Sequence, residues 1–507
     1  MKRVCLSAAI AIALSAGALY ARAEVTLPRI LSSHMVLQRD RPIHLWGWAD
    51  PGEQVTAALN GTKQTTRADD LGKWSVWLAP EQAGGPYQVT VAGTNTITLD
   101  DVMIGDVWFA SGQSNMELPL IGFPGSAELQ NSAEEIAHAN QPQLRLLHIH
   151  EKASEYRVDD IDTTWTDCTP QTAATFSAAA YFFGRDIAEK EHVTVGLIDS
   201  TWGGTPAEAW ISLEGLSADA SLMPVFATWA TMTDQQPDMP RIVAKEKREE
   251  AQAKATGTSA PWHPWHPNPA SWAPAALYNG MVAPVVNFPI RGVIWYQGET
   301  NSALDRAAMY ERVFPALIRD WREQWRQGDF PFLYVQISSF RSTPHEDWAV
   351  VREAQRRTLG VANTAMAVTI DIGNPDNVHP ADKQDVGARL ALAARALSYG
   401  EKVEYSGPAF RKATVDGTAM RVWFDHAVSG LTAKGGEPTG FEVAGADHKF
   451  VTATAHIDGD SIVASNAAVP EPEYVRYGWQ NAPVVNLFNG AGLPASPFTS
   501  EKRIPQP

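Results

Sequence analysis

Two short motifs carry residues that could together perform nucleophilic catalysis. In the first, residues 112–116 (GQSNM), Ser114 follows the apolar run 106–110 and therefore falls on a turn at the end of a predicted strand. In the second, residues 376–380 (DNVHP), a carboxylate and an imidazole lie three positions apart after another apolar run. A serine hydroxyl needs a base to accept its proton, and a histidine oriented by a carboxylate supplies one. Ser114, His379 and Asp376 are therefore the candidate catalytic triad.

Ester hydrolysis also requires hydrogen-bond donors for the oxyanion of the tetrahedral intermediate, and each donor contributes about 10²–10³ in rate. The sequence offers the backbone N–H of Ser114, a glycine N–H in the segment 202–206 (WGGTP), and the side chain of Gln297. Glycine can adopt positive φ and allows the backbone to approach a ligand closely. Asn301 is an alternative donor to Gln297, and Glu299 could order the loop that both share.

These motifs also have simpler structural interpretations. A glycine pair is common in strand-to-helix turns, and Glu299 precedes residues that suit a helix N-terminus. Trp262 and Trp265 could stack on sugar rings or merely pack within an insertion. His263 and His266 have roughly the spacing of metal ligands, but the neighbouring sequence adds no further ligand, so we predict no metal site and no cofactor.

The elements that must position these residues lie between about residues 100 and 400, where apolar runs alternate with amphipathic segments. The predicted strands are 106–111, 143–149, 193–199, 291–296, 331–337 and 365–371. The predicted helices are 126–138, 177–191, 303–325, 346–359 and 381–398. This order predicts a parallel sheet covered by helices on both faces, with ligands bound beyond the carboxyl ends of the strands. Each candidate residue of the triad and the oxyanion site follows a predicted strand, so we expect them to meet at one edge of the sheet.

The remaining sequence predicts flanking parts. Residues 24–100 and 401–507 contain short alternating runs separated by turn signals, typical of small β domains. The domain boundaries are therefore predicted at 24–100, 101–400 and 401–507. An insertion at about 213–270 interrupts the central part and contains a charged helical stretch at 241–255. The chain has no G-x-S-x-G motif, which argues against an α/β-hydrolase.

Residues 1–23 have a basic start, an apolar stretch and a final Ala-Arg-Ala, the pattern of a signal peptide. We therefore predict an exported protein, periplasmic or secreted. The chain has 41 Lys and Arg against 57 Asp and Glu, a net charge of −16. This charge disfavours nucleic acid as a partner. No other apolar stretch reaches about 18 residues, so no membrane span is predicted. Cys168 would be the single cysteine of the processed chain, which excludes an internal disulfide.

Taken together, several motifs resemble the sialate O-acetylesterase family of SGNH hydrolases. The motifs that carry the resemblance are 112–116, 202–210, 278–284, 295–301, 376–380 and 487–498. The resemblance implies a flavodoxin-like three-layer core and serine esterase chemistry without a metal. It also implies Ser114 as nucleophile, His379 as base, Asp376 as its partner, and Gly204 with Gln297 as oxyanion donors. The chain departs from the broader group by reading Gln-Gly-Glu-Thr-Asn where that group often has Asn, which leaves the choice between Gln297 and Asn301 open.

The function implied is removal of O-acetyl groups from carbohydrates through an acetyl-serine intermediate. Acetylated fragments of plant polysaccharides such as xylan or xyloglucan are the favoured substrates, because an aromatic insertion suits a glycan chain. The alternatives are acetylated sialic acids, another class of ester, and a glycan-binding protein without catalysis. If His379 is the base, activity should decline below about pH 6–7 as the imidazole is protonated. The sequence indicates no oligomeric state.

Overall fold

The centre of the molecule is a sheet with strand order β13-β12-β11-β7-β10-β8-β9. The computed structural model describes residues 24–427 and 429–504, so the predicted signal peptide lies outside the described residues. The pairings from β13 to β8 are parallel, and β9 is antiparallel to β8. The strands are β7 (Thr96–Gly112), β8 (Gln141–His148), β9 (Thr166–Cys168), β10 (Val195–Thr201), β11 (Gly292–Tyr296), β12 (Phe332–Gln336) and β13 (Thr364–Val368). Every residue of β10, β11 and β12 is buried, as expected for a parallel sheet covered on both faces.

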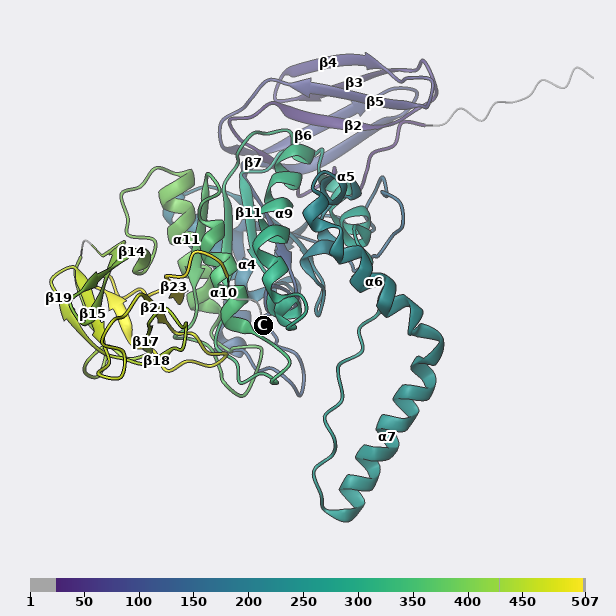
Figure 1. Cartoon of the computed structure of the whole chain (residues 1–507). Helices are drawn as coiled ribbons and strands as arrows, with labels where there is room; N and C mark the ends of the chain where they lie inside the picture. Colours follow the sequence, from purple (N-terminus) through teal and green to yellow (C-terminus); the bar gives the residue numbers. More distant parts are fainter. Residues whose placement is uncertain (1–23, 428, 505–507) are drawn as a thin grey trace, which may run out of the picture.

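Helices cover both faces of this sheet (Figure 1). The ring of Trp108 on β7 contacts Phe183, whereas the ring of the next residue, Phe109, contacts Trp321 and Trp325. Because neighbouring residues of a strand point to opposite faces, the helices that carry these partners lie on opposite sides. The helices of the core are α4 (Ala178–Glu191), α9 (Tyr310–Trp325), α10 (Trp348–Thr358) and α11 (Lys383–Ser398). The fold is therefore the predicted α/β three-layer core.

Two predicted helices are shorter than the sequence pattern indicated. The segment 126–138 contains only α2 (Ser132–Ala137), because Asn131 adopts a left-handed conformation and Phe123 pairs with Ala127. The segment 303–325 becomes α-helical only at Tyr310, after a 3₁₀ turn at Ala307–Met309, because Ala303 pairs with Glu346 in an isolated bridge. In both places, the helix begins later than predicted because of contacts that cannot be inferred from the helix propensity of the local sequence.

The N-terminal region consists of strands that are continuous with the core. Its strands are β1 (Val36–Gln38), β2 (Ile43–Trp48), β3 (Gln54–Leu59), β4 (Thr62–Arg67), β5 (Lys73–Leu78) and β6 (Gly84–Ala92). β2 pairs with β5, while β3, β4 and β6 join the first half of β7. The second half of β7 runs through the central sheet, and one hydrophobic cluster spans both regions. The N-terminal region is thus packed against the core along a shared strand.

The predicted insertion forms an arm. Its helices are α5 (Leu213–Ser217), α6 (Pro224–Asp234) and α7 (Met239–Thr256), followed by α8 (Pro269–Trp272). Figure 1 shows α7 projecting away from the rest of the molecule, and the segment after it returns alongside the helix. In the described part of the chain, no helix combines the length and apolar character needed to cross a membrane.

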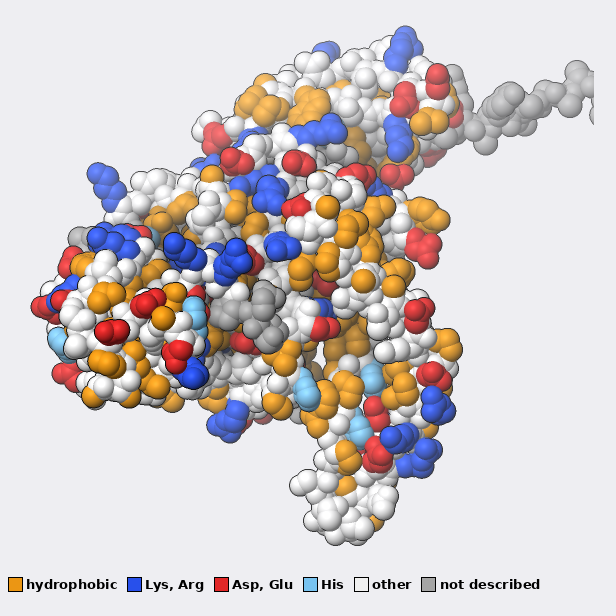
Figure 2. All heavy atoms as spheres, viewed as in Figure 1, with side chains coloured by type: hydrophobic (Ala, Val, Ile, Leu, Met, Phe, Trp, Pro, Cys, Tyr) orange, Lys and Arg blue, Asp and Glu red, His pale blue; other side chains and the backbone are white. Residues whose placement is uncertain are grey.

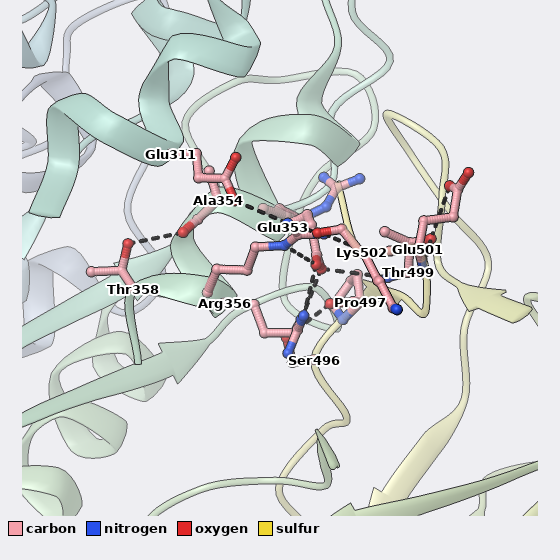
Figure 3. Close-up of polar contacts among 12 residues, drawn as sticks. Glu311, Glu353, Ala354, Arg356, Thr358, Ser496, Pro497, Thr499, Glu501 and Lys502 are labelled. Atoms are coloured by element: carbon pink, nitrogen blue, oxygen red, sulfur yellow. Dashed lines mark hydrogen bonds and ion pairs between the residues drawn. The ribbon is translucent and has the colours of Figure 1, made fainter. Parts of the chain in front are cut away.

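The C-terminal region has its own hydrophobic cluster. Its strands are β14 (Ala409–Asp416), β15 (Ala419–Asp425), β16 (Leu431–Ala433), β17 (Phe441–Ala444), β18 (Val451–Thr452), β19 (Thr454–Asp458), β20 (Ser461–Ser465), β21 (Tyr474–Tyr477), β22 (Leu487–Asn489) and β23 (Phe498–Thr499). Buried Glu353 on α10 connects this region to the core: it pairs with Arg356 at 2.7 Å and accepts the Thr499 N–H (Figure 3). The paired arginines balance the buried carboxylate, which would otherwise be costly.

Candidate active site

Ser114 is the first residue of the short helix α1 (Ser114–Glu117), directly beyond the carboxyl end of β7. The turn depends on Gly112, whose φ is +140° and whose Cβ would lie 2.1 Å from the carbonyl oxygen of Tyr296. Gln113 fastens the turn to the neighbouring strand end: its N–H donates to the Tyr296 carbonyl at 3.0 Å, and its side-chain oxygen accepts the Thr300 N–H at 3.1 Å. The serine is thus held on a turn that only glycine allows.

His379 contacts the hydroxyl of Ser114. Its Nε2 lies 2.9 Å from Ser114 Oγ, and the loop that carries it is fixed by a hydrogen bond from the His379 N–H to the Asn377 side chain. Burial, together with the nearby Lys383 ammonium, lowers the pKa of His379 from 6.5 to about 4. The imidazole is therefore neutral near pH 7, as a general base must be.

Asp376, the predicted partner of His379, points elsewhere in this structure. Its carboxylate forms an ion pair with Arg341 at 2.8 Å, and both side chains are exposed, by 73% and 70%. Among the described residues, no hydrogen bond or ion pair joins Asp376 to His379. The structure therefore brings together two of the three predicted triad residues and leaves the third on the same loop, turned toward solvent.

A buried network lies beneath this pair; the sequence analysis named its Glu299 as possible support for the site but not its Asn115 or Lys383. Asn115 donates to Glu299 Oε1 at 2.6 Å and to the Val378 carbonyl at 2.9 Å. Lys383, buried at the start of α11, donates to Asn115 Oδ1 at 2.9 Å and to the Pro380 carbonyl at 2.7 Å. Burial raises the pKa of Glu299 to about 7 and lowers that of Lys383 to about 7. The network thus joins the turn that carries Ser114 to the loop that carries His379, through the Val378 and Pro380 carbonyls on either side of the histidine.

Replacing Lys383 by methionine should lower the stability of the protein and raise the pKa of the general base His379. The variant leaves Asn115 Oδ1 and the Pro380 carbonyl without their donor, at a cost of about 2–4 kcal/mol. Loss of the neighbouring positive charge should raise the pKa of His379, so the acid limb of kcat/KM should move to higher pH. Denaturant unfolding and a pH profile measure both effects, with exposed Lys402→Met as control. Unchanged stability and an unchanged acid limb would rule out this role.

Gly203 lies beside Ser114, and Gly204, the predicted oxyanion donor, is the next residue along the chain. A Cβ on Gly203 would lie 3.3 Å from Ser114 Cβ, and Gly204 has a φ of +68°. In the described part of the chain, the N–H groups of Ser114 and Gly204 donate to no protein acceptor. Two free amides near the serine can receive an oxyanion.

Gln297, the other predicted oxyanion donor, has no free N–H. Its side-chain nitrogen donates to the Thr205 carbonyl at 3.2 Å and to Asn301 Oδ1 at 2.7 Å, while its oxygen accepts the Tyr310 hydroxyl. Asn301 uses its nitrogen for one bond, to Glu208 at 2.9 Å. The geometry therefore does not support Gln297 as a donor, because other contacts consume both of its hydrogens, whereas Asn301 keeps one.

A carboxyl group lies close to the nucleophile on α1. A Cβ on Gly203 would lie 2.9 Å from Glu117 Oε2 and 3.3 Å from Ser114 Cβ. The Glu117 and Ser114 side chains therefore both lie against Gly203. Burial, with the charges of Glu151 and Asp199, raises the pKa of Glu117 to about 7. His148 Nδ1 lies 3.0 Å from Asp199 on the same side. The Glu117 side of Ser114 thus carries three carboxyl groups, whose effect on Glu117 His148 partly offsets, and the sequence pattern did not indicate this cluster.

The two candidate sugar-binding tryptophans lie in the returning segment of the arm. Trp265 is 64% exposed and lies over the oxyanion loop, since a Cβ on Gly204 would approach its ring to 2.6 Å. Trp262 is 54% exposed, and its ring contacts that of His345 in a tilted arrangement with the centroids 4.5 Å apart. Only Trp265 is thus placed directly over the oxyanion loop.

The histidines of that segment have acidic neighbours that the sequence did not reveal. His266 lies 3.0 Å from Glu246 on α7, and His263 lies 3.5 Å from Glu249. Pale-blue histidine and red acidic side chains adjoin one another on the arm in Figure 2. These contacts tie the returning segment to α7 and so position Trp265.

A second histidine-carboxylate cluster lies away from the site. His34, Asp101 and Asp167 are close enough together to hold a metal ion. Arg145, however, pairs with both carboxylates at 3.1 Å. The guanidinium already balances their charge, so the cluster is explained as an ion-pair network.

Comparisons with known proteins agree with this geometry. A family model described as "carbohydrate esterase, sialic acid-specific acetylesterase" matches residues 253–396. The sialate O-acetylesterase of Rattus norvegicus is 30% identical over 93% of each chain, and that of Homo sapiens is 32% identical over 75% of this chain and 72% of its own.

Among solved structures, a carbohydrate acetylesterase from Xanthomonas citri is 37% identical, covers 94% of this chain and all of its own, and superposes with a TM-score of 0.80. Because the similarity to the rat protein extends over nearly the whole length of both chains, it includes the flanking β regions as well as the core. The chain belongs to the sialate O-acetylesterase family and is a carbohydrate O-acetylesterase.

Proposed function

We propose that the enzyme removes acetyl groups from carbohydrates through an acetyl-serine intermediate on Ser114. The observation that carries this proposal is the 2.9 Å contact between Ser114 Oγ and neutral His379. His379 accepts the Ser114 proton as Oγ attacks the acetyl carbonyl, and the N–H groups of Ser114 and Gly204 bind the oxyanion. Asn301 is our candidate for a third donor.

After the attack, His379 acts as the general acid and completes the first half of the reaction. His379 gives its proton to the sugar oxygen as the C–O bond breaks, which releases the sugar and leaves acetyl-serine. The imidazole then takes a proton from water as the water oxygen attacks the acetyl carbon. Collapse of this intermediate breaks the bond to Oγ, returns the proton to the serine and releases acetate.

We further propose that Asp376 turns from Arg341 to His379 in the working enzyme. Exposed ion pairs contribute only about 0–1 kcal/mol, so the contact with Arg341 is easily exchanged. His379 Nδ1 has no hydrogen-bond partner among the described residues, and Asp376 lies on the same loop. A carboxylate at Nδ1 would fix the tautomer in which Nε2 accepts the serine proton.

Neutral acetylated sugars are the substrate class that the charges near Ser114 favour. Glu117 flanks the nucleophile, and Glu151 and Asp199 add negative charge beside Glu117, which His148 offsets only in part. A sialic acid carries a carboxylate that would be repelled there. This supports our preference for acetylated fragments of plant polysaccharides, with Trp265 stacking on a sugar ring beside the oxyanion loop.

Replacing Glu117 by glutamine should relax discrimination against anionic sugars. We expect wild type to prefer the methyl ester of an O-acetylated sialic acid over the free acid, and Glu117→Gln to reduce that preference about 5-fold. Because the pKa of Glu117 is about 7, the preference in wild type should grow as pH rises through 7. The ratio of kcat/KM values for acetate release measures the effect, with exposed Glu437→Gln as control. An unchanged ratio would contradict the assignment.

Acetylated sialic acid is the second candidate substrate, favoured by the names of the family and of the rat and human relatives. Acetate release from acetylated xylo-oligosaccharides, xyloglucan oligosaccharides and acetylated sialic acid decides between the two, with Ser114→Ala as background. Faster release from the plant-type sugars supports our proposal, and faster release from sialic acid replaces it. Sugar binding without release from any of them would instead indicate a binding protein.

We also propose that the enzyme is exported, on the basis of the sequence of residues 1–23. Detection of the chain in the periplasmic or culture fraction, with Glu24 as its first residue, is the expected result.

A further inference from the structure

A groove lies between the N-terminal β region and the core, at the end of the sheet opposite to Ser114. Two adjoining cavities of about 340 and 540 Å³ share His44, Asp159 and Asn287 in their walls. Asn287 precedes β11, whereas Ser114 adjoins the far end of that strand. Five residues of strand separate the two ends by about 15 Å, so the groove is not part of the active site.

Tryptophans from β2 and β5 dominate one wall of the groove. Trp77 lies opposite His44 in the strand register, and the two rings stack in parallel at 4.0 Å. His44 is fixed by a contact of 3.0 Å between its Nδ1 and the Asn287 carbonyl. Trp77 nevertheless remains 54% exposed. A rigidly held indole that is half open to a cavity is a platform on which the apolar face of a sugar ring can stack.

Positively charged groups without acidic partners line the larger cavity beside Trp77. In the described part of the chain, no carboxylate lies within ion-pair distance of Arg41 or Arg326. Asp159, the carboxylate that also lines this cavity, pairs with Lys73 at 3.7 Å. Burial and the neighbouring Arg291 lower the pKa of Arg41. Basic side chains are visible along the junction of the two regions in Figure 2. The half-buried guanidinium of Arg41, with exposed Arg326 beside it, favours an anionic ligand.

The same cavity contains polar groups suited to hydroxyls. Gln327 Nε2 is buried and has no hydrogen-bond partner, and Asp159 and Asn287 are exposed at the rim. A buried donor without an acceptor is costly, and because the half-buried Gln327 side chain lines the cavity, a turn of its amide toward a ligand hydroxyl would satisfy it. Arg157, by contrast, is already paired with Glu214 at 2.8 Å. Aromatic, cationic and amide groups therefore converge on one cavity.

We propose that this groove binds an acidic saccharide, a pyranose that carries a carboxylate. The ring stacks on Trp77, the carboxylate pairs with Arg41, and Gln327 donates to a hydroxyl. Such a site would hold a uronic-acid-substituted glycan at a distance from the bond being cleaved. It leaves the preference of the catalytic site for neutral acetylated units unaffected, because the two sites lie at opposite ends of the sheet.

Calorimetric titration of the full-length protein with unacetylated sugars tests the proposal. The probes are a glucuronic-acid-substituted xylo-oligosaccharide, the same oligosaccharide without the acid, and N-acetylneuraminic acid. We expect saturable binding of the substituted oligosaccharide, at least 10-fold tighter than that of the neutral one. Arg41→Met should remove this difference, and Trp77→Ala should weaken binding of both by 10-fold or more. Tighter binding of N-acetylneuraminic acid would identify it as the source of the acidic sugar.

Two matched variants locate the binding site. Trp423→Ala removes a half-buried tryptophan on β15 of the C-terminal region, and Arg241→Met removes an exposed arginine on α7; both should bind as wild type does. All four variants should release acetate from a small acetyl ester at the wild-type rate, which shows that they are folded. Absence of saturable binding in wild type, wild-type binding by Arg41→Met and Trp77→Ala, or loss of binding in Trp423→Ala would each overturn the proposal.

Discussion

Replacing Ser114 by alanine is expected to lower kcat for acetate release by about 10⁴-fold or more. The hydroxyl is the group that attacks the acetyl carbonyl, and His379 Nε2 contacts its oxygen at 2.9 Å. The N–H donors of Ser114 and Gly204 remain in the variant, so a residual rate above that of water is expected from oxyanion binding alone. Steady-state assays on an acetylated oligosaccharide measure the loss.

Two further observations make this result specific. Acid quenching of wild type during turnover should trap an acetyl group on the peptide that contains Ser114, and the variant should show none. Ser217→Ala, which removes an exposed hydroxyl on α5, should retain wild-type kcat. If Ser114→Ala kept a tenth or more of the wild-type activity, the acetyl-serine mechanism would be wrong.

Replacing Asp376 by asparagine is expected to lower kcat by about 10²–10⁴-fold, with little change in stability. The loss follows if Asp376 orients His379 and stabilises the imidazolium that forms when Ser114 is deprotonated. The stability is preserved because Asp376 is 73% exposed and its contact with Arg341 is a surface pair. Removing the competitor in Arg341→Gln should leave kcat unchanged or raise it.

The pH dependence of activity tests independently whether Asp376 interacts with His379. A carboxylate beside an imidazole raises its pKa, so the acid limb of wild type should lie above that of Asp376→Asn. Without the carboxylate, burial and Lys383 hold the pKa of His379 at about 4, and the acid limb of the variant should lie there. If the two profiles coincide near pH 4 and kcat is unaffected, His379 works without Asp376, and the decline predicted at pH 6–7 is wrong as well.

The sequence by itself determined which segments form the central sheet and which residues follow each strand. The apolar runs at 106–110 and 365–370 became the ends of β7 and β13, because parallel strands buried on both faces need uninterrupted apolar side chains. Parallel strands end at one edge, so Ser114 and His379 meet although they are 265 residues apart in the chain.

Only the tertiary structure decided which polar groups are free to act. The sequence named Gln297 as a donor, but Thr205 and Asn301 consume both of its hydrogens. It assigned no role to Lys383, whose place at a helix start is typical of an exposed residue, yet the fold buries it against Asn115. The periodicity of apolar residues indicates which face of a helix or strand is buried. Which acceptor a side-chain N–H bonds to, and which charge a charged group pairs with, depend instead on groups distant in the chain. No local sequence pattern contains that information.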